Sequence, residues 1–136
     1  MLEYGVRGHD FGRMTALELG EAIAARGIAW VQLALAKALT TPDCRTGNLS
    51  PGLAKRIAGD LGRSGVGIAV LGCYINPVDE DAGAREAGLA RFREHLRYAR
   101  DFGCPLVATE TGWRGRSEVA IQPLGPCPHA SPTCHM

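Results

Sequence analysis

Strand-like and helical patterns alternate along this chain, and that alternation limits the folds open to it. Four short runs predict strands, at residues 4–10, 28–35, 67–75 and 105–109. Amphipathic stretches separate them, and a glycine ends each stretch: Gly27, Gly65 and Gly103. Alternation of this kind implies a parallel sheet with right-handed crossovers. The chain is therefore predicted to be α/β, either an open doubly wound sheet or part of a (β/α)8 barrel.

Capping residues and apolar stripes support the predicted helices. Thr15 and Glu18 form a Thr-x-x-Glu capping box, and Ser50 with Pro51 marks the second helix start. The apolar side chains that recur at helical spacing predict the faces that cover the sheet: Ala16, Leu19, Ile23, then Leu53, Ile57, Leu61, then Leu89, Phe92, Leu96 and Ala99. The mainly apolar run 28–35 predicts a strand covered on both faces.

Composition excludes several classes of protein. A net charge of +1 without a basic stripe gives no support to nucleic-acid or membrane partners. No segment approaches the ~18 consecutive apolar residues of a membrane span, and the N-terminus lacks a signal-peptide layout, so a cytoplasmic location is expected. The cysteines are then expected to stay reduced, with Cys73 and Cys104 as buried thiols. Neither nucleotide-binding glycine motif is present.

Four blocks at successive strand ends carry a resemblance to a known family. They cover residues 5–12, 31–34, 71–77 and 109–112. Together they closely resemble the sugar phosphate isomerase/epimerase family, whose xylose isomerase-like TIM barrel is shared with AP endonucleases that use several metal ions. The resemblance implies isomerisation or epimerisation of a sugar or sugar phosphate at the carboxyl face of the barrel. It also implies a divalent metal ion, with Mn, Mg, Co and Zn not distinguished.

The candidate site residues are polar groups at these strand ends. Glu110 is predicted to be a general base, or a metal or hydroxyl contact, because barrel enzymes place working residues there. His9 and Asp10 are predicted substrate contacts, with turn formation as the alternative. Asn76 is predicted to donate to a sugar hydroxyl, although Asn-Pro is also a common turn. Gln32 lines either the pocket or the core, and the sequence does not choose between these.

The resemblance ends near residue 112, so residues 1–112 are predicted to be the N-terminal half of a TIM barrel. The family's metal ligands come mainly from later strands, which leaves the metal ligands unknown here and predicts that this chain binds no metal. Residues 113–136 read as an irregular Pro/Cys/His tail, disordered or frameshifted, and their cysteine and histidine spacing does not match a zinc finger.

A truncated and inactive isomerase fragment is therefore expected. Two alternatives stay open. One is a non-catalytic half-barrel that forms homo-oligomers through its unpaired sheet edges. The other is an AP-endonuclease-like member of the same superfamily, which the missing basic stripe disfavours.

Overall fold

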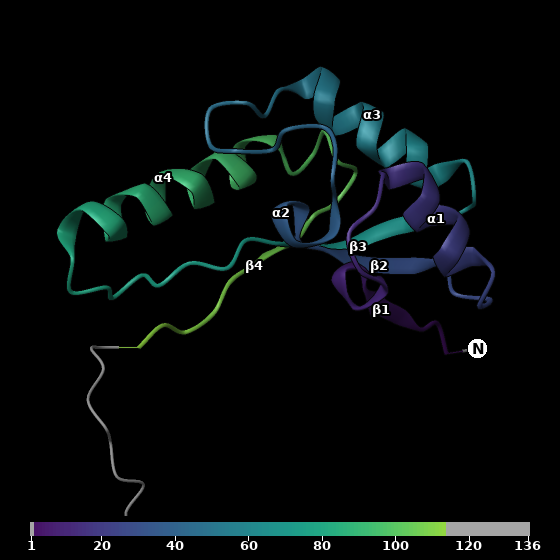
Figure 1. Ribbon diagram of the computed structural model, residues 1–136, viewed down its shortest axis with the longest axis horizontal. Coiled ribbons are helices and arrows are strands. Elements are labelled where there is room, and N and C mark those ends of the chain that lie inside the picture. The colour runs from purple at the N-terminus through teal and green to yellow at the C-terminus, as the bar shows by residue number, and fades with distance from the viewer. Residues whose placement is uncertain (1, 114–136) are drawn as a thin grey trace, which may run out of the picture.

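The computed structural model describes residues 2–113, in which four parallel strands form one sheet in the order β1-β2-β3-β4 (Figure 1). The strands are β1 (Gly5–Arg7), β2 (Trp30–Leu33), β3 (Gly67–Gly72) and β4 (Val107–Ala108). The helices are η1 (Gly8–Phe11, 3-10), α1 (Ala16–Ala24), α2 (Leu35–Ala38), α3 (Pro51–Gly62) and α4 (Ala82–Tyr98). The predicted α/β class, with parallel strands and alternating helices, is confirmed. No helix in residues 2–113 is long and apolar enough to cross a membrane.

The core lies between the sheet and the helices on one of its faces. Figure 1 shows α1 and α3 next to each other, and their apolar side chains form one cluster with Val31 and Leu33 of β2. In β2, Val31 and Leu33 are fully buried, whereas Trp30 is 37% exposed and Gln32 is half-buried. Side chains alternate between the faces of a strand, so one face of β2 is covered and the other is open. The prediction that this strand is covered on both faces was therefore wrong.

The predicted starts of α1 and α3 are confirmed. Thr15 Oγ1 accepts a hydrogen bond from the Glu18 amide, and the Glu18 carboxylate accepts one from the Thr15 amide, which completes the capping box. Ser50 caps α3 with Pro51 in its first turn. Of the stripe residues on these two helices, all are buried except Leu53, which is partly buried.

All four strands are shorter than the sequence predicts, and two of these differences affect the site. The chain turns after Arg7 into η1, so His9 and Asp10 lie in a 3-10 turn directly after the strand and not within it. Gly8 permits this turn, because a Cβ there would lie 3.2 Å from Val31 Cγ2 and 3.3 Å from Leu19 Cδ2. Likewise β2 ends at Leu33, and residues 35–38 form α2, a short helix that the continuous apolar run concealed.

Helix α4 covers less than its sequence pattern predicts. Leu96 is 53% exposed, Leu89 and Phe92 are half-buried, and His95 is the buried residue of the helix. Ala99, just after the helix, is buried as predicted. The tail that was predicted to be irregular lies outside the described residues, apart from Trp113.

Candidate functional site

Tyr74 is the centre of a polar cluster at the carboxyl ends of β1, β2 and β3. It lies two residues beyond β3. The Gln32 side-chain amide of β2 donates a hydrogen bond to the Tyr74 hydroxyl over 2.5 Å. The His9 ring of η1 lies edge-on to the Tyr74 ring, with 6.2 Å between the ring centroids. Two predicted site residues, His9 and Gln32, thus meet at a tyrosine that had not been singled out.

A cation completes the surroundings of the Tyr74 ring. Lys37 Nζ lies 4.2 Å from the ring centroid, which is a cation–π contact. Helix α2 places it there, since Leu35 and Ala38 are buried while Lys37 is exposed. The sequence did not indicate Lys37, because the short helix that presents it has no visible cap or period.

His9 carries an unsatisfied polar atom. Its Nδ1 is buried and has no hydrogen-bond partner among residues 2–113. Leaving such an atom unpaired costs about 1–3 kcal/mol, so buried polar groups nearly always have partners. His9 Nδ1 is thus a polar atom without a partner among the described residues beside the strand ends, and it is covered from solvent in this conformation.

Helix α4 contacts the backbone of Tyr74. Arg91 Nη2 donates to the Tyr74 carbonyl oxygen over 2.6 Å, and His95 Nδ1 lies 2.9 Å from the Arg91 carbonyl oxygen. Because a carbonyl only accepts, His95 carries its proton on Nδ1. Burial lowers the pKa of His95, which keeps the ring neutral near pH 7. Lys37, Tyr74, Arg91 and His95 all line a small cavity of about 110 Å³.

Asn76 and Glu110 line a second cavity, of about 340 Å³, together with Tyr74, Asp79 and Arg91. The Asn76 side chain accepts from the Trp113 amide over 3.0 Å and donates to the Trp113 carbonyl over 2.8 Å. These two bonds fix the segment that follows β4 against the end of β3. Glu110 is exposed at the cavity edge. Tyr74 therefore contacts two predicted site residues, His9 and Gln32, and shares a cavity with two others, Asn76 and Glu110.

Asp10 lies apart from both groups. Its carboxylate pairs with Arg7 over 3.1 Å, and both side chains are at least half exposed. That ion pair stabilises the turn between β1 and α1 at most weakly, because exposed pairs contribute about 0–1 kcal/mol.

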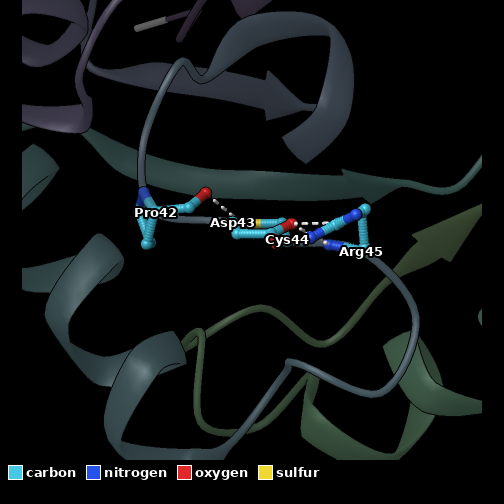
Figure 2. A network of polar contacts seen from close by, with 4 residues as sticks. All are labelled: Pro42, Asp43, Cys44 and Arg45. Atoms are coloured by element: carbon cyan, nitrogen blue, oxygen red, sulfur yellow. Dashed lines mark hydrogen bonds and ion pairs between the residues drawn. The ribbon is translucent and has the colours of Figure 1, made fainter.

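An adjoining cavity of about 700 Å³ is lined by three arginines, Arg13, Arg45 and Arg91. Figure 2 shows part of its wall, where the Cys44 thiol donates to the Pro42 carbonyl and Arg45 pairs with Asp43 over 2.6 Å. Arg13 donates to the Leu39 carbonyl over 2.9 Å. Asp43 is the one acidic residue in this lining, so the three arginines give the cavity a net positive charge.

The surroundings of the two thiols near these cavities, Cys44 and Cys73, raise the pKa of each. Burial, with the Asp43 charge as a second cause, raises the pKa of Cys44 to about 11. Burial also raises the pKa of Cys73, despite the opposing effect of Arg91. A thiol acts as a nucleophile in its thiolate form, so neither cysteine is suited to that chemistry. Cys104 is buried, as predicted.

The metal implied by the resemblance does not fit the described residues. Within residues 2–113, no three side chains of His, Cys, Asp or Glu lie close enough together to hold a metal ion. Glu110 is exposed, and Asp79 is the other carboxylate of its cavity. Zinc sites take three or four protein ligands, which this pair does not supply.

Comparison with known proteins supports the fold. No family model matches the chain, and no curated protein matches its sequence significantly. Among solved structures, the crystal structure of D-psicose 3-epimerase in the presence of D-fructose is similar, with a TM-score of 0.56 and 16% sequence identity. The match covers 79% of this chain, which spans 37% of the epimerase chain. The partial α/β barrel of TIM type is thereby confirmed, while membership of the isomerase/epimerase family stays a prediction.

Proposed function

We propose that this chain forms a sugar-binding surface of an isomerase or epimerase, with a monosaccharide or its phosphate as the ligand. The observation that carries the proposal is the meeting of His9, Gln32 and Tyr74 at the carboxyl ends of three neighbouring parallel strands. That edge is where barrel enzymes bind their substrates. The similar solved structure is an epimerase crystallised with a ketose, which supports the same class of ligand.

The hydrogen-bonding directions in this cluster suit a polyol. Gln32 donates to the Tyr74 hydroxyl, so the phenolic proton is free to be donated elsewhere. His9 Nδ1 has no partner among the described residues, and in this proposal a rotation of the His9 ring exposes it to a ligand hydroxyl. A few placed polar groups beside an aromatic ring are typical of small-molecule sites. In this proposal Tyr74 and His9 hold adjacent sugar oxygens.

Glu110 is the proposed general base. Isomerisation and epimerisation of a sugar both remove a proton from the carbon beside the carbonyl group, and a carboxylate at the cavity edge can accept it. Glu110 shares its cavity with Tyr74. In this proposal the Tyr74 hydroxyl, which accepts from Gln32, donates its proton to the carbonyl oxygen. Since the described residues do not fit a metal ion, no step in this proposal depends on one.

The arginine-lined cavity favours a phosphorylated sugar. Arg13, Arg45 and Arg91 line it, and Arg91 also lines the cavity of Tyr74 and Glu110. Guanidinium groups bind phosphate oxygens well because their donors are arranged as a planar fork. A sugar phosphate that spans the two cavities would place its phosphate beside Arg91.

Ligand titration of the full chain tests this proposal. We expect D-fructose and its 6-phosphate to bind in calorimetric titrations, and Tyr74→Phe to weaken binding about 5-fold, because one hydrogen bond contributes about 1 kcal/mol. Tyr98→Phe is the matched control, since Tyr98 packs against the hydrophobic core. If the two variants bind equally, Tyr74 is not a sugar contact. If turnover is detected and Glu110→Gln does not reduce it, the assignment of the base is wrong.

A further inference from the structure

The sheet has a free edge on each side within the described residues. β1 pairs only with β2, and β4 pairs only with β3. The carbonyls of Leu106 and Ala108 accept from the amides of Leu71, in β3, and Cys73, directly after it. Successive residues of a strand direct their backbone groups to alternate edges, so the N–H and C=O of Val107 point to the free edge. Unpaired edges of this kind are templates for pairing with another strand.

Within residues 2–113, the sheet face away from the hydrophobic cluster carries exposed apolar side chains. Trp30 of β2 is 37% exposed on that face, and Leu106, the residue before β4, is 58% exposed. Leu106 belongs to this face because its neighbour Val107 packs against the core on the other side. In a closed barrel the corresponding face is the packed interior.

We propose that a second copy of this chain closes the sheet, so that two copies form one eight-stranded parallel barrel. All four strands run in the same direction, in sequence order. A two-fold rotation about the barrel axis keeps every strand parallel and pairs β4 of each copy with β1 of the other. Two sets of four strands give the eight of this barrel type.

Charge at the two edges is compatible with the same partner. Arg7 ends β1, where it pairs with Asp10 of its own copy, and Glu110 follows β4 by two residues. Pairing β4 with β1 of the second copy places the exposed Arg7 guanidinium and the Glu110 carboxylate at the same end of neighbouring strands. Both free edges of each copy are used in this arrangement, so assembly stops at two copies. The dimer does not depend on the proposed sugar chemistry, although it would bring two Tyr74 clusters to one barrel mouth.

Sedimentation velocity of the full chain tests the closure. We expect the wild type to sediment as a dimer at micromolar concentration and Leu106→Arg to weaken the dimer at least 10-fold, because a charge would enter the barrel interior. Gly59→Arg is the matched control, since a side chain at Gly59 on α3 meets no atom within 4 Å. A monomeric wild type, open-ended oligomers, or a dimer that Leu106→Arg leaves intact would each overturn the proposal.

Hydrogen exchange on the wild type provides an independent readout if Leu106→Arg does not fold. We expect the Val107 amide to exchange more slowly as the protein concentration rises, because it would donate across the interface. The Leu33 amide in the interior strand β2 should show no comparable dependence. Equal exchange of Val107 at low and high concentration would overturn the proposal.

Discussion

Helices α1 and α3 are attached to the sheet in a different way from α4. On α1 and α3, Leu19, Ile23, Ile57 and Leu61 are at most 1% exposed and belong to one hydrophobic cluster. On α4, the corresponding leucine, Leu96, is 53% exposed. All three helices carry an apolar stripe, so the difference lies in what each stripe meets. α1 and α3 pack against each other and share one cluster with the central strands, whereas α4 meets Tyr74 and Ile75, which lie beyond the end of β3.

Polar contacts hold α4 instead. The Glu94 carboxylate accepts from the amides of Gly47 and Leu49, over 2.9–3.2 Å, and Arg91 donates to the Tyr74 carbonyl. These bonds attach α4 to the loop that leads into α3 and to the candidate site. The comparison shows that one repeated βα pattern can be stabilised by apolar burial in one region and by hydrogen bonds in another. The less buried helix is also the one that carries Arg91, which contacts Tyr74 in the candidate site.

Truncating one leucine in each region should give the largest difference. We expect Leu19→Ala to lower the free energy of unfolding by about 3 kcal/mol, since it removes a fully buried side chain and leaves a cavity. Leu96→Ala should change it by less than about 0.5 kcal/mol, as is usual for exposed positions. Urea unfolding followed by circular dichroism measures both. Equal losses would mean that α4 is buried as deeply as α1.

Removal of the Glu94 carboxylate should have an intermediate effect. Glu94→Ala leaves the amides of Gly47 and Leu49 without their acceptor, and hydrogen bonds to charged groups contribute about 1.5–3 kcal/mol before allowance for partial exposure. We expect a loss of about 1 kcal/mol in urea unfolding. Glu86→Ala, whose carboxylate forms one exposed ion pair with Arg93, is the control. If Glu94→Ala lowers the stability no more than the control does, the hydrogen bonds from Gly47 and Leu49 do not stabilise α4.

The well-packed region was also the more predictable one. Thr15 with Glu18 and Ser50 with Pro51 are local signals, and each fixed its helix start correctly. Leu19 and Ile57 are buried, as their helical spacing predicts, because the apolar faces of α1 and α3 meet each other and the sheet. The exposure of Leu96 could not be read from α4 itself, since it depends on which elements the helix meets in the folded chain.

Within the site, the sequence indicated strand ends but not side-chain contacts. His9 and Gln32 were chosen by position, and both meet Tyr74, which lay inside a quoted block without being selected. Lys37 depends on an unforeseen short helix, and Arg91 reaches Tyr74 from a distant helix. Such contacts arise from tertiary packing and leave no periodic signal.

The buried histidine of α4 should give the weaker helix a pH dependence of its own. Burial lowers the pKa of His95 below its unfolded value of about 6.5, so the unfolded chain binds the proton more readily. The His95 contribution is then fully present above pH 6.5 and is lost as the pH falls through the lower folded pKa. We expect urea unfolding to show a greater loss of stability between pH 7.5 and 5 for the wild type than for His95→Gln, which keeps an amide donor near the Arg91 carbonyl. Parallel losses in the two proteins would show that other groups cause the acid sensitivity and that α4 contributes none of it.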